Sequence, residues 1–184
     1  MNDNVKLAKA TNSAVGIRLL TEADAGDWWQ LRHVALDTEP HSFVETPEEH
    51  LAKSVESMRD YFRSFNADNF IIGAFDKGAL AGMAGYYRQK HAKFQHKGHI
   101  WGVYVRGASR RKGIAKQMLE DIVRLARMSA GIAQITLTVA ATQAAARELY
   151  LSLGFITYGV EPRSLKIGDE HVDDELMVLF LNTK

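Results

Sequence analysis

The sequence predicts an α/β layered fold with a mixed, largely antiparallel central sheet of about seven strands flanked by about four helices. Apolar residues alternate as in strands in some segments and recur at helical spacing in others. These patterns follow one another as a strand, two helices, three strands, a helix, a strand, a helix and two strands. The chain has 184 residues, of which 46% are hydrophobic, which is enough for one folded core. The prolines are scattered and no repeat is visible, so we expect a flexible segment over residues 1–14 and a single domain over residues 15–184.

The first strand and the first two helices have recognisable start signals. Residues 15–20 read as a strand, and Thr21 with Asp24 three residues later forms a capping pattern for a helix. The apolar face of that helix carries Trp28, Leu31 and Ala35. Residues 37–46 are predicted as a loop. A capping threonine at Thr46, followed by proline and then glutamate, marks the start of a second helix. Its apolar positions are Leu51, Val55, Met58 and Phe62.

The rest of the chain alternates between strand and helix patterns. Residues 70–75 and 80–87 flank Asp76-Lys77-Gly78, whose residue types are typical of a hairpin turn. A helix is predicted from Gly113 to a stop near Gly131. The remaining predicted elements are a strand over 99–105, a strand over 134–139, a short helix over 146–153 closed by Gly154, and strands over 155–160 and 176–181 that the acidic stretch 168–175 joins.

The composition excludes several classes of protein. Twenty-three basic and 22 acidic residues leave a net charge of +1, which gives no reason to expect binding to nucleic acid or to an anionic membrane. The absence of cysteine excludes disulfides, thiolate metal sites and a covalent cysteine intermediate. The longest apolar run, residues 176–181, is far shorter than the roughly 18 residues of a membrane helix, and the first residues lack the apolar core of a signal peptide. We therefore expect a soluble, cytoplasmic protein.

A basic loop between a predicted strand and a predicted helix, residues 103–115, carries the clearest chemical signal. The free N–H groups of a helix's first turn point outward at the positive end of the helix dipole, so an anion there gains hydrogen bonds and charge stabilisation. Gly113 and Ala115 leave room for an extended phosphate to approach the backbone. Three positive charges lie beside that turn, at Arg110, Arg111 and Lys112. The segment predicts phosphate binding, and the plain alternative is a solvated basic loop before an ordinary helix.

Other phosphate-binding motifs do not fit this loop. A P-loop needs a glycine followed by lysine and then serine or threonine, whereas here Lys112 precedes Gly113. The dinucleotide pattern G-x-G-x-x-G is also absent from the loop. A lone basic triplet in a nearly neutral chain gives only weak support for binding nucleic acid.

The loop resembles the pyrophosphate loop of the GCN5-related N-acetyltransferase (GNAT) family, which reads Gln or Arg, two residues, Gly, one residue, and Gly or Ala. The matching residues are Arg110, Arg111, Lys112, Gly113, Ile114 and Ala115. A second family signature, an Asn followed by Ala, Leu-Tyr and Gly-Phe, is matched at Ala146, Leu149-Tyr150 and Gly154-Phe155, with Gln143 in the place of the Asn. The order of strands and helices agrees over about residues 15–181, and the resemblance is strongest over residues 103–155.

This resemblance implies an N-acetyltransferase domain that uses acetyl-CoA as its co-substrate. The pyrophosphate would lie on main-chain N–H groups of the loop and helix start, from Arg110 to Lys116. The pantetheine arm would lie as a strand-like segment between two splayed parallel strands, Val103–Val105 and residues 135–139. A main-chain N–H near Tyr104 would polarise the thioester carbonyl and stabilise the oxyanion. Gln143 would replace the usual asparagine contact to the cofactor.

Acetyl transfer requires two proton movements, because the amine must lose a proton and the departing thiolate gains from receiving one. Tyr150 matches the family's tyrosine near the cofactor sulfur and is the expected acid, unless it is only a core residue. His99 lies where histone-acetylating members carry a glutamate, so it is the expected base, with His96 as second choice. The alternatives are a surface histidine and proton removal through water. Without cysteine, direct attack by the amine in a ternary complex is favoured.

No metal site is expected. The chain has seven histidines, but no pair has ligand spacing such as H-E-x-x-H. His91, His96 and His99 lie close in sequence without a nearby acidic partner.

The expected acceptor is a primary amine on a small metabolite, an amino-acid-like compound, or a protein lysine or N-terminus. In the GNAT family the first two helices, their loop and the loop between the last two strands shape the acceptor site. Acidic residues there would favour a cationic amine, unless they are merely solvated. They are Asp37, Glu39, Glu45, Glu48, Glu49, Asp169, Glu170, Asp173, Asp174 and Glu175. Trp28, Trp29 and Phe43 are candidate substrate contacts or core aromatics.

Two other functions remain open from the sequence. A non-catalytic acyl-CoA-binding or regulatory module would retain the loop without turnover, and Gln143 in place of asparagine favours it. A nucleic-acid-binding domain rests only on residues 110–112, and we expect neither nucleic acid nor membrane as partner. Since a dimer is common among similar proteins, the resemblance suggests a homodimer as one oligomeric state.

Overall fold

The computed structural model describes residues 15–181, which form one seven-stranded sheet in the order β1-β2-β3-β4-β5-β7-β6. The strands are β1 (Val15–Leu19), β2 (Asn69–Asp76), β3 (Ala79–Arg88), β4 (Lys97–Val105), β5 (Gln134–Ala140), β6 (Ile156–Ile167) and β7 (Glu170–Phe180). All neighbours are antiparallel except β4 and β5. The predicted mixed, largely antiparallel sheet is confirmed. The segment 1–14, predicted to be flexible, lies outside the described residues.

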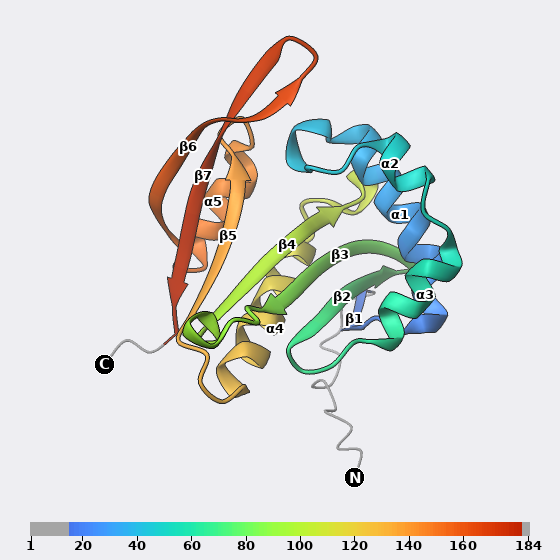
Figure 1. Ribbon diagram of the computed structural model, residues 1–184. Coiled ribbons are helices and arrows are strands. Elements are labelled where there is room, and N and C mark those ends of the chain that lie inside the picture. The colour runs from blue at the N-terminus through green and yellow to red at the C-terminus, as the bar shows by residue number, and fades with distance from the viewer. Residues whose placement is uncertain (1–14, 182–184) are drawn as a thin grey trace.

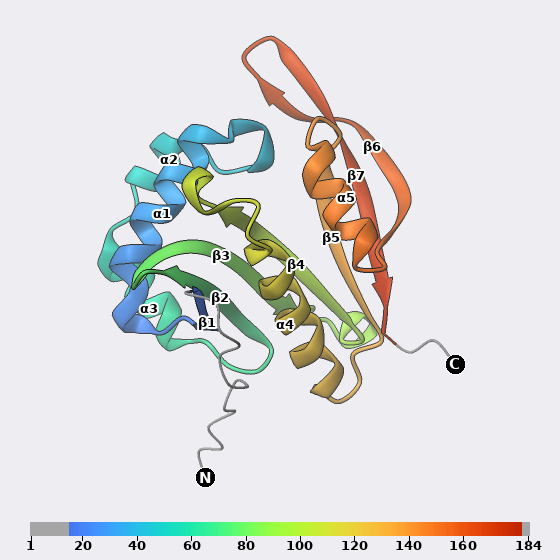
Figure 2. The same ribbon diagram turned by 180° about the vertical axis from the view of Figure 1, so that it is seen from behind.

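Helices cover both faces of the sheet (Figures 1 and 2). The helices are α1 (Ala25–Thr38), α2 (Pro47–Leu51), α3 (Val55–Arg63), α4 (Ile114–Met128) and α5 (Ala144–Ser152). On one face, α1 and α3 bury Leu31 and Phe62 against the sheet. On the other, α4 buries Met118 and Ile122, and α5 contributes Tyr150 to the same cluster. Within the described residues, no helix has the length and apolar character needed to cross a membrane.

The predicted second helix is two helices, which corrects the sequence analysis. The capping box at Thr46 is present, since the Thr46 side chain accepts from the N–H of Glu49 at 3.2 Å and the Glu49 carboxylate accepts from the N–H of Thr46. However, α2 ends at Leu51, and Ser54 begins α3 by accepting from the N–H of Ser57 at 3.1 Å. The helical spacing of apolar residues continues across the break, so periodicity alone did not reveal this second cap.

The acidic stretch 168–175 is mostly strand rather than a joining segment. β6 extends to Ile167, and β7 begins at Glu170 after a turn at Gly168, where φ is +59°. Two of the carboxylates, those of Asp173 and Asp174, are tolerated within the strand because each accepts a hydrogen bond. The Asp174 carboxylate accepts from the Ser164 hydroxyl at 2.6 Å, and that of Asp173 accepts from the main-chain N–H of Arg163 at 2.7 Å.

The parallel strands β4 and β5 pair over only three positions. Their ladder begins at Lys97 and Gln134 and ends at His99 and Thr136, although β4 continues to Val105. Beyond that point β4 remains paired with β3, and β5 remains paired with β7. The two strands therefore diverge, as Figure 1 shows, and the facing strand edges beyond His99 and Thr136 have no strand between them.

A bulge in β4 explains this divergence. Between the pairs Gly85–Trp101 and Met83–Tyr104, β4 contains one residue more than β3. A bulge bends its strand and strengthens the local twist. The extra length falls at Gly102, whose φ of +63° is readily adopted only by glycine.

We expect Gly102→Val to destabilise the fold by about 1–3 kcal/mol, the typical cost of holding a non-glycine residue in this backbone region. A Cβ atom at Gly102 would lie 3.5 Å from Arg32 Nη1, an ordinary contact, so the cost is one of backbone strain. Urea denaturation of the variant measures this change.

Gly16→Val on β1 is the matched control. A Cβ atom there meets no atom within 4 Å, and the φ of Gly16 is not positive, so its stability should stay within about 0.5 kcal/mol of wild type. If the Gly102 and Gly16 variants were equally stable, the bulge would not require glycine at position 102.

Candidate active site

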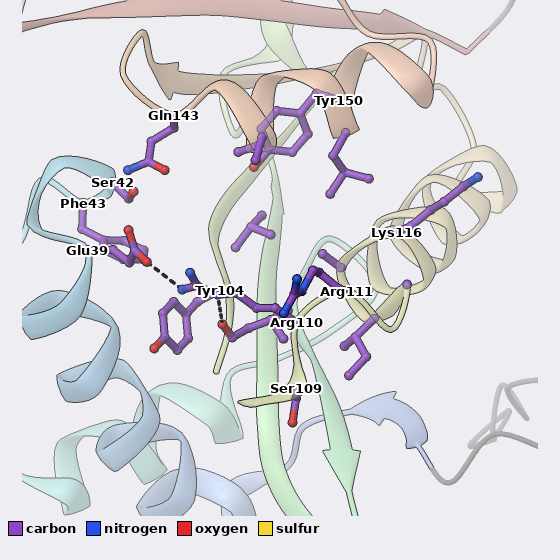
Figure 3. A pocket seen from close by; sticks show the side chains of 18 residues that line it. Glu39, Ser42, Phe43, Tyr104, Ser109, Arg110, Arg111, Lys116, Gln143 and Tyr150 are labelled. Carbon is purple, nitrogen blue, oxygen red and sulfur yellow. Dashed lines mark hydrogen bonds and ion pairs between the residues drawn. The ribbon is translucent and has the colours of Figure 1, made fainter. Parts of the chain in front are cut away.

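A cavity of about 400 Å³ opens where β4 and β5 diverge (Figure 3). Its wall consists of the end of β4, the loop into α4, the first turn of α4, one side of α5 and the segment after α1. Most residues proposed from the sequence line it. They are Val103, Tyr104, Val105, Arg110, Arg111, Gly113, Ile114, Ala115, Lys116, Gln143 and Tyr150. Lys112 and His99 do not line it.

The N-terminus of α4 is open toward this cavity. Gly113 is the N-cap residue, with a φ of +76° and no side chain to cap the helix. The first turn, residues 114–116, contains no acidic residue, and all three residues line the cavity. Arg111, in the same loop, also has a positive φ, +61°. The arrangement leaves main-chain donors and the positive end of the helix dipole available to an anion.

The Arg110 side chain is bound by the protein itself. Its Nε donates to the main-chain oxygen of Val105 at 2.9 Å, and its Nη2 donates to Glu39 Oε1 at 2.7 Å, as the dashed lines in Figure 3 show. Its guanidinium also lies 5.6 Å from the centre of the Tyr104 ring. Arg110 thus fixes the loop against β4 and the segment after α1.

Of the other two basic residues of the loop, Lys112 is bound by a described side chain and Arg111 is not. Lys112 Nζ donates to Asp76 Oδ2 at 2.7 Å, and the Ser109 hydroxyl donates to the same oxygen at 2.8 Å. These two donors lower the pKa of Asp76. Arg111 lines the cavity and makes no side-chain hydrogen bond or ion pair with any described residue. The predicted group of three available charges is therefore reduced to Arg111 in this structure.

Tyr150 presents its hydroxyl to the cavity from α5 (Figure 3). The residue is only 6% exposed, and burial raises its pKa, so the phenol is neutral at physiological pH. Its hydroxyl makes no hydrogen bond within the described residues. The described buried side-chain polar atoms without a partner are Arg32 Nη1, His33 Nδ1 and Tyr86 OH. Because Tyr150 OH is not among them, it is accessible from the cavity and free to donate.

Gln143 occupies the N-cap position of α5. Its main chain is engaged, because its N–H donates to Ala140 and its carbonyl accepts from the N–H of Arg147. Its side chain lines the cavity and makes no hydrogen bond within the described residues. The amide extends toward Ser42 across the cavity (Figure 3), so it can offer both a donor and an acceptor to a ligand.

His99 lies at the apex of the diverging strands rather than in the cavity wall. Its neighbour Ile100 packs into the cluster beneath α4, so His99 faces the opposite side of the sheet, that of α1 and α3. Its ring lies 5.1 Å from that of Tyr87, and its Nδ1 is 3.0 Å from Thr136 Oγ1. Burial lowers the pKa of His99. Its role as base stays a prediction, as does that of His96.

Most acidic residues considered for acceptor binding are engaged elsewhere. Glu39 is the acidic residue among those that line the cavity, and it pairs with Arg110. Glu45 binds Arg32 and Lys53, and Glu175 binds Arg147. Of the aromatic candidates, Trp28 is buried in the core, Trp29 donates to the Lys53 carbonyl, and Phe43 lines the cavity.

Some residues at the site gave no sequence signal. Ser42, Ser109 and Ala145 line the cavity, but small residues at a cavity and small residues in solvent look the same in a sequence. Thr136, the partner of His99, appeared only as one position of an alternating strand. Within the part of the chain that the structure describes, no group of three or more His, Asp or Glu residues could hold a metal ion.

Comparison with known proteins agrees with this architecture. Three structures illustrate it. An acetyltransferase of the GNAT family from Streptococcus pneumoniae is 21% identical, with a TM-score of 0.82 over 91% of this chain and 99% of that one. An acetyltransferase from Salmonella typhimurium, yncA, with its cofactor acetyl-CoA, is 19% identical, with a TM-score of 0.80 over 94% and 96%. A phosphinothricin acetyltransferase from Sinorhizobium meliloti in complex with acetyl-CoA is 19% identical, with a TM-score of 0.78 over 91% and 89%.

At these identities the structural likeness establishes the fold. No curated protein sequence matches the chain. The family model for the acetyltransferase (GNAT) family matches residues 22–155, which include the open helix N-terminus, the diverging strands and Tyr150. Because this match covers well over half of the sequence, the chain belongs to the GNAT family of N-acetyltransferases.

Proposed function

We propose that this enzyme transfers the acetyl group of acetyl-CoA directly to a primary amine within a ternary complex. The observation that carries the proposal is the uncapped N-terminus of α4 beside a cavity between two diverging parallel strands. The helix end can bind a diphosphate, and the strand edges can hold an extended chain with amide groups. Two structures of the same fold contain acetyl-CoA, which supports this choice of co-substrate.

The residues present fit coenzyme A. The N–H groups of residues 114–116 and the side chain of Arg111 would bind the pyrophosphate, because neither has another partner among the described side chains. The main chain of Val103–Val105 would pair with the pantetheine amides, and a main-chain N–H near Tyr104 would polarise the thioester carbonyl. The co-substrate supplies the activated acetyl group.

Two side chains would manage the protons. The Tyr150 hydroxyl is neutral, accessible from the cavity and without a partner among the described residues, so it is placed to donate to the departing sulfur. His99 would take the proton of the amine, directly or through a water molecule. Because burial lowers its pKa, His99 is neutral at pH 7 and able to accept.

The proposed acceptor is a primary amine of a metabolite, of an amino-acid-like compound or of a protein. Glu39 is the carboxylate at the cavity, and its pairing with Arg110 neutralises most of its field. The described residues that line the cavity therefore do not select for a strongly cationic acceptor. The acidic loops considered in the sequence analysis would have favoured one.

A non-catalytic acyl-CoA-binding module is the second candidate, and Gln143 in the place of the family's asparagine favours it. One experiment separates the two. We would measure acetyl-CoA-dependent thermal stabilisation, and then thiol release with four probes: L-phenylalanine, spermidine, an N-terminally blocked peptide with one lysine, and a peptide with a free N-terminus. The enzyme predicts both signals, whereas the module predicts stabilisation alone. Absence of stabilisation by acetyl-CoA would refute both.

We expect Gly113→Val to lose measurable acetyl-CoA binding in calorimetry. A Cβ atom at Gly113 meets no protein atom within 4 Å, so the valine side chain projects into the open space beside the helix N-terminus and blocks an approaching phosphate. Backbone strain is the competing explanation, since φ at Gly113 is +76°.

Gly78→Val is the control for that strain. Gly78 has a φ of +84°, its Cβ atom would also meet nothing within 4 Å, and it lies in the turn between β2 and β3. The two variants should lose similar stability, while only the Gly113 variant loses binding. Normal acetyl-CoA affinity in Gly113→Val would remove the pyrophosphate assignment.

We expect Tyr150→Phe to lower kcat about tenfold to a hundredfold without changing acetyl-CoA affinity, because the variant keeps the ring and removes only the donor. Tyr158→Phe serves as control, since Tyr158 is 58% exposed on β6 and does not line the cavity. Steady-state rates measure the effect. A Tyr150 variant with unchanged turnover would exclude the hydroxyl from the reaction.

A further inference from the structure

His99 and Thr136 form the last pair of the β4–β5 ladder before the strands diverge. Their side chains meet, with His99 Nδ1 at 3.0 Å from Thr136 Oγ1. The same Thr136 hydroxyl lies 3.3 Å from the main-chain oxygen of Gly98, to which it donates. A chain of hydrogen bonds therefore runs from the Gly98 carbonyl through Thr136 to the imidazole.

These two contacts favour one ring nitrogen of His99 as the carrier of the proton. A carbonyl oxygen can only accept, so Thr136 forms hydrogen bonds with both neighbours only when its single hydroxyl hydrogen points to Gly98. Thr136 Oγ1 must then accept from the imidazole, which requires a hydrogen on Nδ1. In the neutral imidazole, the lone pair is left on Nε2.

Nε2 is accessible to a reactant. It makes no hydrogen bond within residues 15–181, and it is not one of the buried polar atoms without a partner in that range. An atom that is neither bonded nor buried is open to solvent. The Nε2 atom thus lies on the side of the sheet occupied by α1 and α3, at the apex of the diverging strands.

No neighbouring charge contributes to the shift in the pKa of His99. Tyr87 faces it from β3 with its ring at 5.1 Å, and burial raises the pKa of that phenol, so it is neutral. Thr136 faces it from β5 and carries no charge. On its own strand, Lys97 directs its Nζ over the Phe94 ring, 5.0 Å from the ring centre. Burial alone lowers the pKa of His99.

We propose that Thr136 is a positioning residue that holds His99 in the Nδ1–H tautomer, so that Nε2 accepts the proton of the acceptor amine. The proposal rests on the proposed function, because it needs an amine to deprotonate. It assigns a role to a residue outside the cavity wall.

The reaction balances with this assignment. The amine nitrogen bonds to the acetyl carbon and its proton goes to His99 Nε2, which becomes imidazolium. The carbon–sulfur bond breaks, its electron pair goes to sulfur, and Tyr150 donates a proton to that sulfur. Return of one proton from His99 to solvent and uptake of one by Tyr150 restores the enzyme. The net products are an N-acetylated amine and free coenzyme A.

The test compares wild type with Thr136→Val and Thr136→Ser, using whichever of the four amine probes reacts fastest with wild type. Valine has the shape of threonine without the acceptor oxygen, and serine retains that oxygen. We expect the valine variant to lower kcat about threefold to tenfold, the effect of one lost hydrogen bond, and the serine variant to recover most of it. Acetyl-CoA affinity, measured by calorimetry, should be the same in all three.

The pH profile gives a readout that simple destabilisation would not move. The Nδ1–H to Oγ1 bond is stronger when the ring is cationic, so its loss lowers the pKa of His99 further. The acid limb of kcat should therefore move to lower pH by about half to one unit in Thr136→Val. The acceptor amine titrates in the same way with every variant, so a difference between their pH profiles comes from His99.

Nitrogen-15 NMR of the His99 ring tests the tautomer without any turnover. Above its pKa, wild type should show the unprotonated nitrogen at Nε2, and the valine variant should lose this preference. A wild-type signal with the proton on Nε2 would overturn the proposal. So would a pH profile that is identical in wild type and Thr136→Val while wild type turns over. If wild type releases no thiol with any probe, the proposed function fails instead.

Discussion

The divergence of β4 and β5 is the constraint from which the rest of this site follows. Two parallel strands that remained paired to their ends would leave no unpaired main chain in the middle of the sheet. Here the left-handed backbone at Gly102 bends β4 three residues beyond its last pair with β5, at His99. β4 stays paired with β3 on both sides of the bulge, and β5 stays paired with β7, so the sheet holds both walls of the opening. Unpaired strand edges favour aggregation at the rim of a sheet, whereas in its interior they can pair with an extended ligand.

The electrostatics of the site depend on main chain more than on side-chain charge. Arg110 and Lys112 both form ion pairs with the protein, to Glu39 and Asp76. These pairs tie the loop to the segment after α1 and to the end of β2. The loop thereby holds Gly113 in the conformation that leaves the first turn of α4 uncapped. A rigid array of N–H donors binds an anion without the ordering of long flexible side chains.

The sequence predicted what depends on local chemistry and missed what depends on tertiary partners. The order of strands, the capping box at Thr46 and the basic loop were readable because each is encoded within a few neighbouring residues. The break at Ser54 was missed because the apolar spacing continues through it. The strand over residues 170–175 was missed because its carboxylates look like a solvated loop until Ser164 and Arg163 are brought beside them.

The roles of the basic residues show the same division. Three adjacent positive charges predict one anion site, yet only folding reveals that Glu39 and Asp76 approach two of them. The Thr136 contact with His99 likewise joins residues 37 positions apart, and strand alternation alone gives it no special status. The family motifs include the helix start and Tyr150, which line the cavity, whereas Thr136 lies in neither motif.

The proposed acid and base lie on opposite faces of the sheet, and this fits a direct transfer. Tyr150 belongs to the cluster beneath α4 and α5, and His99 faces the side of α1 and α3. A thioester held between the separated strands would be open to both faces, because the cavity is lined by Phe43 from the side of α1 and by Tyr150 from α5. The amine can then attack from one face beside its base, while the sulfur departs toward an acid on the other. In the proposed reaction the two protons would move along separate paths, so the neutral phenol and the neutral imidazole would not need to exchange a proton with each other. In the proposed mechanism, the opening in the sheet would therefore hold the co-substrate and also separate the two proton transfers.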